Sequence, residues 1–245
     1  MSNRITMLWT VPRSVSTSFE RMMSARGDHV VLDEPFSRSY YYGPDRRSSR
    51  YTDSLPQSSA EEVLATIEEA ARERPVFVKD MAYQAATLLG PDLLGRFHNC
   101  FLVRDPAATL RSLAKRWPDF TDEESGWQRL DQAVGIVDGL GQPRVVVDAD
   151  LLCGDPAAVV EEWCARMGLP YLEEALTWEP GMRAEWGLWD EWHASSARST
   201  GFGELPDPPP PPTPDEHRLH EAYEAALPVY RRLAAEAITG TPRTP

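Results

Sequence analysis

Long apolar runs are missing from this sequence. Although 42% of its 245 residues are hydrophobic, no stretch approaches the roughly 20 consecutive apolar residues that a membrane-crossing helix needs. The N-terminus also lacks a basic segment followed by an apolar one, because Met1 to Thr6 lead straight into a short strand pattern. We therefore expect a cytoplasmic protein with no membrane span and no signal segment.

Cysteine is scarce as well. The chain has 3 cysteines, an odd number, and none of them has the short spacing of a metal site. Cys100, Cys153 and Cys164 all lie in apolar segments. We expect them to be buried thiols in a reducing compartment.

Basic residues are outnumbered, with 25 lysines and arginines against 38 aspartates and glutamates, and the net charge is −13 at pH 7. This balance disfavours a general nucleic-acid-binding surface, and we expect no nucleic-acid partner. Basic residues that the fold gathers in one place of so acidic a chain would mark an anion site.

The ATP-type phosphate loop, G-x-x-x-x-G-K-[ST], is absent too. In its place, residues 8–22 run from an apolar strand through a turn rich in serine and threonine, with Arg13 inside it, into a helix. The first N–H groups of a helix have no partner within it and lie at the positive end of its dipole, so they bind anions. An ordinary cluster of helix-capping hydroxyls is the structural alternative. The candidate anion-binding residues are Pro12, Arg13, Ser14, Val15, Ser16, Thr17 and Ser18.

A second strand-to-helix junction repeats this signal. The apolar segment 98–103 is followed by Arg104, by Asp105 at a capping position and by Pro106, which suits a first helical turn. Ser112 then lies about two turns into the helix and could face back toward the end of the strand. Arg104 and Ser112 could therefore hold one phosphate between them.

Strand-like and helix-like segments alternate along the chain. This pattern predicts an α/β fold in three layers, with a mainly parallel central sheet, helices on both faces and a phosphate-loop-like strand, loop and helix at the N-terminus. Ligands of such folds bind at the carboxyl ends of the strands. The expected strands are 5–9, 30–32, 76–79, 98–103 and 144–148, and the expected helices include 60–74, 121–139 and 156–167.

The length of the chain suits one domain over residues 1–245. Residues 37–57 are polar, contain three consecutive tyrosines and are too long for a simple connector, so we expect a lid or an acceptor-binding loop there. Residues 206–214 are a polyproline spacer. They lead into an expected C-terminal helix over residues 215–238.

Taken together, the two anion signals resemble those of the sulfotransferases that use 3′-phosphoadenosine 5′-phosphosulfate (PAPS). That family has a first loop of the form T-x-P-[KR]-S-x-[ST]-T, here residues 10–17, and a later R-[DN]-P with a serine eight residues after the arginine, here Arg104 and Ser112. The resemblance covers roughly residues 5–170. Both motifs occur in the family's order along the chain.

The resemblance implies PAPS as co-substrate, adenosine 3′,5′-bisphosphate as product and a small acceptor with a hydroxyl or an amine. The first loop would bind the 5′-phosphosulfate, and Arg104 with Ser112 the 3′-phosphate. Arg198 and Gly201 resemble, more loosely, the family's C-terminal loop that closes over the 3′-phosphate.

A sulfuryl group carries less charge than a terminal phosphoryl group, so we expect no metal. Arg13 and Lys79 could supply the positive charge that the transfer needs.

The proton acceptor is less plainly marked. In the cytosolic branch of the family a strand ends in K-x-H, whose histidine is the base, but this sequence has Lys79-Asp80-Met81. Methionine cannot accept a proton. Glu34, just after the second strand, resembles the glutamate that bacterial and Golgi carbohydrate sulfotransferases use, and we expect it to be the catalytic base. The alternatives are Asp80, Asp33 and His193.

The sequence leaves alternatives open for the function, the oligomeric state and the role of the tryptophans. A nucleotide-dependent kinase of the phosphate-loop class, or a nucleotide-binding module with a dead site, would also fit an anion-binding loop. A homodimer is compatible with the sequence. Four tryptophans between residues 178 and 192 belong either to the core or to a wall of the acceptor site.

Overall fold

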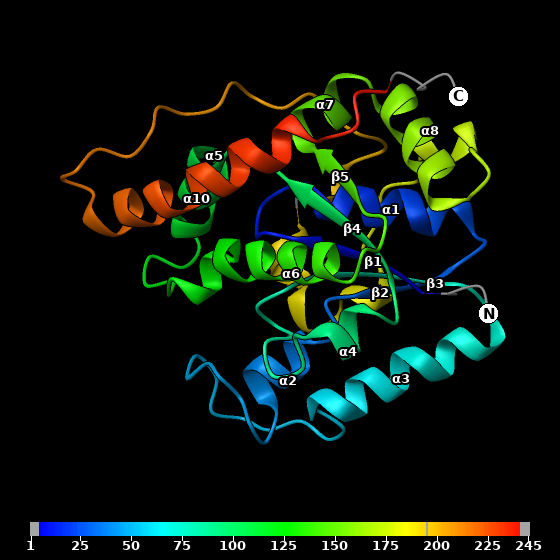
Figure 1. Cartoon of the computed structure of the whole chain (residues 1–245), viewed down its shortest axis with the longest axis horizontal. Coiled ribbons are helices and arrows are strands. Elements are labelled where there is room, and N and C mark those ends of the chain that lie inside the picture. The colour runs from blue at the N-terminus through cyan, green and yellow to red at the C-terminus, as the bar shows by residue number, and fades with distance from the viewer. Residues whose placement is uncertain (1–4, 195, 241–245) are drawn as a thin grey trace.

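One parallel sheet forms the centre of the molecule. The computed structural model describes residues 5–194 and 196–240. Five strands lie in the order β2-β3-β1-β4-β5, and every neighbouring pair is parallel (Figure 1). The predicted α/β fold is thereby confirmed. The strands are β1 (Ile5–Thr10), β2 (Val30–Asp33), β3 (Val76–Met81), β4 (His98–Val103) and β5 (Val145–Asp148).

Helices occupy the connections between the strands and the C-terminal part of the chain. The longer ones are α1 (Ser16–Arg26), α3 (Ala60–Glu73), α5 (Pro106–Ala114), α6 (Trp127–Gly139), α8 (Pro156–Met167) and α10 (His217–Ala235). The short ones are α2 (Ser37–Tyr42), α4 (Pro91–Leu94), α7 (Ala149–Gly154) and α9 (Asp190–His193), with 3₁₀ turns η1 (Glu123–Ser125), η2 (Glu173–Leu176), η3 (Ala184–Trp189) and η4 (Ser196–Arg198).

The two faces of the sheet pack against two separate cores. Met7 and Trp9 of β1 face the core to which α3, α4, α5, α6 and α10 contribute, whereas Leu8 faces the core of α1, α7 and α8. This alternation is what a strand buried on both faces requires. The three predicted layers are therefore present.

Local capping explains where α5 begins. The carboxylate of Asp105 accepts hydrogen bonds from the backbone N–H groups of Ala107 and Ala108 at 2.8 and 3.1 Å, and Pro106 occupies the first turn. Both features follow from the sequence pattern. The helix start sets the position of Ser112 relative to the end of β4.

The strand order determines where a ligand can bind. Strand β1, which leads into the first loop, lies between β3 and β4. The chain therefore adds β2 and β3 on one side of β1, and β4 and β5 on the other. In open α/β sheets, such a switch point opens a crevice at the carboxyl ends of the strands. The ends of β1, β2, β3 and β4 meet there.

Some boundaries differ from those expected. The first six residues of the expected loop 37–57 form the buried helix α2, because Tyr40, Tyr41 and Tyr42 pack against other aromatic rings. The expected helix 121–139 is divided into η1 and α6 at Gly126, which has φ of 84°. The last helix runs over His217–Ala235 instead of residues 215–238. Residues 206–213 carry no helix or strand.

The helices and the cysteines were both assessed from the sequence above. None of the helices in the described ranges is long and apolar enough to cross a membrane. The three cysteines are free and buried, as expected, and burial raises the pKa of Cys100 to about 12.

Candidate active site

The loop after β1 leads sharply into the first turn of α1. Arg13 and Val15 have φ values of 67° and 71°, a left-handed conformation that turns the loop sharply. No side chain caps α1, and its first turn contains no acidic residue. The serine and threonine hydroxyls are thus not used to cap the helix, which answers the structural alternative. They and the backbone N–H groups remain able to bind an anion.

Thr10 holds this loop against the sheet. Its hydroxyl donates to the carbonyl of Leu102 in β4 at 3.1 Å and also contacts the hydroxyl of Ser14. Thr10 and Ser14 are both completely buried. The threonine of the first motif therefore supports the loop from below.

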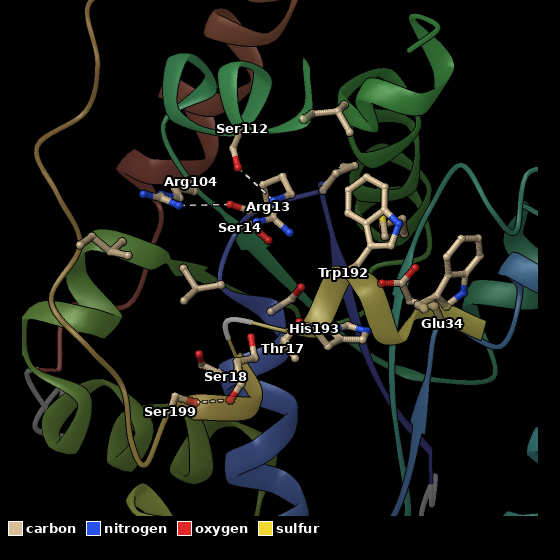
Figure 2. A pocket seen from close by; sticks show the side chains of 18 of the residues that line it. Arg13, Ser14, Thr17, Ser18, Glu34, Arg104, Ser112, Trp192, His193 and Ser199 are labelled. Carbon is tan, nitrogen blue, oxygen red and sulfur yellow. Dashed lines mark hydrogen bonds between the residues drawn. The ribbon is translucent and has the colours of Figure 1, made fainter. Parts of the chain in front are cut away.

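Arginines from both anion signals meet beside this loop. Nε of Arg13 donates to the hydroxyl of Ser112 at 3.0 Å, and Arg104 donates to the backbone carbonyl of Arg13 at 3.2 Å (Figure 2). Nε of Arg104 is buried without a partner. Burial lowers the pKa of Arg13, and the nearby charges of Arg116 and Arg104 lower it further. This combination of crowded positive charge and an unsatisfied donor fits an anionic ligand.

A cavity of about 700 Å³ joins these groups to the carboxyl ends of the strands. The residues from the C-terminal segment that line it include residues 198–205. All the residues expected to bind the donor line this one cavity: Pro12, Arg13, Ser14, Val15, Ser16, Thr17, Ser18, Arg104, Ser112, Arg198 and Gly201.

Aromatic side chains line the other end of the cavity, where Glu34 also lies. Trp192 stands between the two ends: Arg13 lies 5.8 Å from its ring centre, and the ring of Trp117 lies 4.7 Å away, edge to face. Trp189 donates to the hydroxyl of Ser37 at 2.8 Å. The aromatic residues of this end, which belong to one cluster, are Tyr41, Tyr83, Trp117, Trp189 and Trp192, whereas Phe202 lines the cavity from the other core.

The four tryptophans between residues 178 and 192 divide between the two roles left open by the sequence. Trp189 and Trp192 line the cavity, whereas Trp186 is buried and donates to Glu20 at 2.9 Å. Trp178 packs on Phe202. The segment therefore contributes to both the core and the cavity wall.

Lys79 lies below the cavity and does not line it. It is completely buried within β3, two residues before the end of that strand. Its ammonium contacts Asp33, lies 2.7 Å from an oxygen of Glu34 and 3.8 Å from one of Glu20. Lys79, which the sequence marks as a possible source of positive charge for the transfer, therefore does not face the cavity directly. Its charge is instead directed at carboxylates that flank the cavity.

The carboxylates around Lys79 differ in ionisation. Burial raises the pKa of Glu20 well above its usual value, and the charge of Asp33 adds to that shift. Burial alone would also raise the pKa of Asp33, but the charge of Lys79 and the hydrogen bond with His193 outweigh it and lower that pKa. The pKa values of these two neighbouring carboxylates are therefore shifted in opposite directions, that of Glu20 upward and that of Asp33 downward.

Glu34 occupies the boundary between this cluster and the cavity. Its backbone has φ of 45°, its side chain also accepts a hydrogen bond from Gln84 at 3.1 Å, and the residue is 9% exposed. It lines the cavity near Trp192 (Figure 2). Glu34 is therefore a carboxylate with two hydrogen-bond partners and access to a ligand.

The other candidate bases are placed differently. The carboxylate of Asp80 accepts from the backbone N–H groups of Phe36 and Met81, both at 2.8 Å, and does not line the cavity. His193 lines the cavity and lies between Thr17 and Asp33, 3.2 and 3.0 Å away. Its position was open in the sequence, and the two contacts could not be expected from it.

Further contributors had no signal in the sequence. Tyr83, Gln84 and residues 202–205 line the cavity, yet no motif marks them. Arg111, which precedes Ser112 in α5, pairs with Glu216 at 2.7 Å and does not line the cavity.

Comparison with protein families shows to which family the chain belongs. The model of the family described as "Sulfotransferase domain" matches residues 4–237. The chain belongs to the sulfotransferase family. The resemblance stated from the two motifs is thereby confirmed.

Solved sulfotransferases share the fold of this family member. The "Sulfotransferase Domain from the Curacin Biosynthetic Pathway" aligns with a TM-score of 0.51 and 14% identity over 90% of this chain and 96% of its own. The "Sulfotransferase Domain from the Synechococcus PCC 7002 Olefin Synthase" aligns with a TM-score of 0.50 and 17% identity over 90% of this chain and 94% of its own.

Two plant proteins are similar in sequence. They are "Branched-chain-amino-acid aminotransferase-like protein 2" and "protein 1" of Arabidopsis thaliana, each 30% identical over 229 residues. The match covers 92% of this chain and 40% of each plant protein. The sulfotransferase chain thus spans about two fifths of the length of these relatives.

Proposed function

We propose that this sulfotransferase transfers a sulfuryl group from PAPS to a hydroxyl or an amine of a small acceptor. The observation that carries the proposal is one cavity lined by an uncapped helix start, an arginine with a buried unpaired donor and a glutamate. Anion binding at one end and proton acceptance at the other are the two requirements of sulfuryl transfer.

The donor would bind along the loop after β1. The N–H groups at the start of α1, the hydroxyls of the loop and Arg13 would hold the 5′-phosphosulfate. Arg104 and Ser112 would hold the 3′-phosphate, with Arg198 and Gly201 closing over it. The unpaired Nε of Arg104 supports this assignment, because a phosphate oxygen would satisfy it.

Glu34 would accept the proton of the acceptor. As the acceptor oxygen or nitrogen forms its bond to sulfur, the proton passes to Glu34, the bond from sulfur to the bridging oxygen breaks and adenosine 3′,5′-bisphosphate leaves. Arg13 would stabilise the negative charge that develops on the bridging and sulfuryl oxygens. Lys79 would act through Glu34, which it holds at 2.7 Å. The aromatic end of the cavity favours an acceptor that is apolar at least in part.

A metal ion is not part of this proposal. Ligand atoms of Asp33, Glu34 and His193 lie within 4.8 Å of one another, but the ammonium of Lys79 already contacts both carboxylates. A cation is therefore supplied by the chain itself.

We also propose a cytoplasmic location, because a PAPS-dependent enzyme would find its donor there.

Two other activities are less well supported by these residues. A kinase would bind magnesium and ATP, yet the loop lacks the glycines and the lysine of the ATP-type motif. An aminotransferase, as the names of the plant relatives suggest for those proteins, needs a lysine that forms a Schiff base. Neither Lys79 nor Lys115 lines the cavity.

Calorimetry with and without EDTA tests the donor assignment. We expect tight, metal-independent binding of adenosine 3′,5′-bisphosphate and weak binding of magnesium ATP; a preference for magnesium ATP would overturn the proposal. A screen of hydroxylated and amine metabolites with PAPS, read by mass spectrometry as the mass of an added sulfuryl group, would then identify the acceptor. A protein that binds the bisphosphate but sulfates nothing would be a nucleotide-binding module.

A further inference from the structure

His193, at the end of α9, connects the donor loop to the buried charge cluster. Its Nδ1 lies 3.2 Å from the hydroxyl of Thr17, in the first turn of α1, and its Nε2 lies 3.0 Å from a carboxylate oxygen of Asp33. The ring of Trp186 stacks on the imidazole with 4.7 Å between centroids. The side chain is only 3% exposed, so its orientation is set on several sides. Figure 2 shows Thr17 and His193 adjacent in the cavity.

The contact with Asp33 determines which nitrogen carries hydrogen. The side chain of Asp33 is completely buried and in contact with the ammonium of Lys79, a contact that favours its ionised form. An ionised carboxylate only accepts hydrogen bonds, so Nε2 of His193 donates. The hydrogen on Nε2 is therefore present in both charge states of the imidazole. The difference between those states lies entirely at Nδ1, which faces Thr17.

The state of Nδ1 controls the hydroxyl of Thr17. When the imidazole is neutral, Nδ1 is an acceptor, and the hydroxyl of Thr17 donates its hydrogen to Nδ1 and not to a ligand. When Nδ1 is protonated it becomes a donor, Thr17 accepts from it, and the hydrogen of the hydroxyl is free for another acceptor. An anion in the loop is such an acceptor. A proton on His193 and an anion beside Thr17 therefore stabilise each other.

We propose that His193 is a proton-linked positioning residue for the donor. Binding of the 5′ anion of the nucleotide takes up one proton from solvent at Nδ1 of His193, and the hydroxyl of Thr17 turns to donate to that anion. One N–H bond forms, Thr17 keeps its hydrogen, and no other covalent bond changes. The inference rests on the proposed function, because it needs the nucleotide in the loop after β1.

The groups around His193 are compatible with this proton uptake. Among the described side chains, Asp33 and Glu34 at the end of β2 face it, and Lys79 of β3 pairs with Asp33, Glu34 and Glu20 of α1. Two cations, Arg13 and Arg116, lie over the ring of the preceding residue, Trp192. The added proton enters a cluster in which the carboxylates outnumber the one ammonium. If the protein takes up a proton when the nucleotide binds, linkage requires that the nucleotide binds more tightly at lower pH.

Calorimetry of adenosine 3′,5′-bisphosphate in EDTA tests the proposal. Titrations in two buffers of different ionisation enthalpy, repeated between about pH 5 and 8 where imidazoles change charge, report the protons taken up per nucleotide. The nucleotide's own phosphates also titrate in this range, so the decisive quantity is the difference between variants. We expect the wild type to take up as much as one proton more than His193→Gln. The affinity of the wild type for the bisphosphate should also fall more steeply with rising pH than that of His193→Gln, by as much as about tenfold more per pH unit.

Matched variants separate proton linkage from a structural role. Thr17→Val should lose the extra proton although His193 is intact, and Thr17→Ser, which keeps the hydroxyl, should retain it. The control is His29→Gln: His29 is also buried beside an aspartate, 2.6 Å from Asp28, but does not line the cavity. This variant should match the wild type in proton uptake.

Each outcome has a definite meaning. Equal proton uptake by wild type and His193→Gln overturns the inference, even if the variant binds more weakly at every pH, since a merely structural histidine has that effect. Loss of the extra proton in His193→Gln but not in Thr17→Val also overturns it, because the route through the hydroxyl would be wrong. If the wild type binds no bisphosphate at any pH, the proposed function itself fails and this inference falls with it.

Discussion

Arg104 carries a buried donor without a partner at the edge of the cavity. A buried polar group left unpaired costs about 1–3 kcal/mol, and natural proteins keep few of them. A bound phosphate oxygen would remove that cost. The residue is thus better explained by a ligand than by the fold alone, although it also donates to the carbonyl of Arg13 at 3.2 Å.

Replacement of Arg104 should separate these two roles. A charge-assisted hydrogen bond contributes about 1.5–3 kcal/mol, so Arg104→Ala should weaken adenosine 3′,5′-bisphosphate binding by roughly ten- to a hundredfold in calorimetry. Adenosine 5′-phosphosulfate, which lacks the 3′-phosphate, should bind nearly as before. Arg111→Ala serves as the control, because Arg111 pairs with Glu216 outside the cavity. An equal loss for both ligands would mean that Arg104 supports the loop and not the phosphate.

Glu34 is the residue on which turnover should depend most. Glu34→Gln keeps the size of the side chain and an acceptor oxygen but removes the basic group, so kcat should fall by about 10²–10⁴ while bisphosphate affinity stays nearly unchanged. The measurement is steady-state transfer at saturating acceptor together with calorimetry.

Met81 offers a second test of the same assignment. It lines the cavity at the end of β3, where a histidine would restore the K-x-H pattern of the cytosolic sulfotransferases. Met81→His should recover part of the activity that Glu34→Gln loses. If Glu34→Gln retains normal turnover, the base is another group, and His193 is then the candidate that lines the cavity.

At the scale of elements, the loop between β1 and α1 combines strain with function. Val15 is β-branched and has φ of 71°, a conformation that such residues rarely adopt. Strained backbone of this kind persists where the surrounding structure enforces it and is often found at ligand sites. Here it directs the loop into α1 so that the first N–H groups face the cavity.

Substitution at Val15 should show whether this conformation is needed. Proline fixes φ near −65° and removes an N–H group, so Val15→Pro should weaken bisphosphate binding by about tenfold or more. Val15→Gly permits positive φ and should keep binding close to that of the wild type. Circular dichroism would confirm that both variants are folded. Normal binding by a folded Val15→Pro would show that the loop conformation is not required.

At the scale of the whole molecule, an acidic chain gathers arginines at one cavity. The net charge is −13, yet Arg104 and Arg116 lie close to Arg13. Burial lowers the pKa of Arg13 most, and the charges of these two arginines lower it further. A bound anion relieves this repulsion only in the folded protein. Ligand binding should therefore stabilise the fold.

Thermal unfolding measures that stabilisation. At a bisphosphate concentration about 100 times Kd, binding contributes about 2.7 kcal/mol, which corresponds to a rise in Tm of about 5–10 °C for a chain of this size. Magnesium ATP at the same concentration should produce a much smaller rise. An equal or larger shift with magnesium ATP would favour a kinase.

Much of the fold could be predicted because its signals are local. Apolar runs of strand length, the capping residues Ser59 and Asp105 and the first turn of α5 depend on neighbours within a few residues. The helix α2 could not be predicted, because its tyrosines are stabilised by rings from distant parts of the chain, such as Trp117 and Trp189.

The sequence by itself determined the order of the elements, the parallel sheet and the two strand-to-helix junctions that carry the proposed anion-binding residues, since each depends on residue types at short spacings. Only the tertiary structure decided that Lys79 lies beneath Glu34 instead of facing the cavity, and that His193 bridges Thr17 and Asp33. These contacts join residues far apart in the chain. Their geometry follows from how the sheet twists and how the C-terminal segment packs over it, which no local pattern encodes.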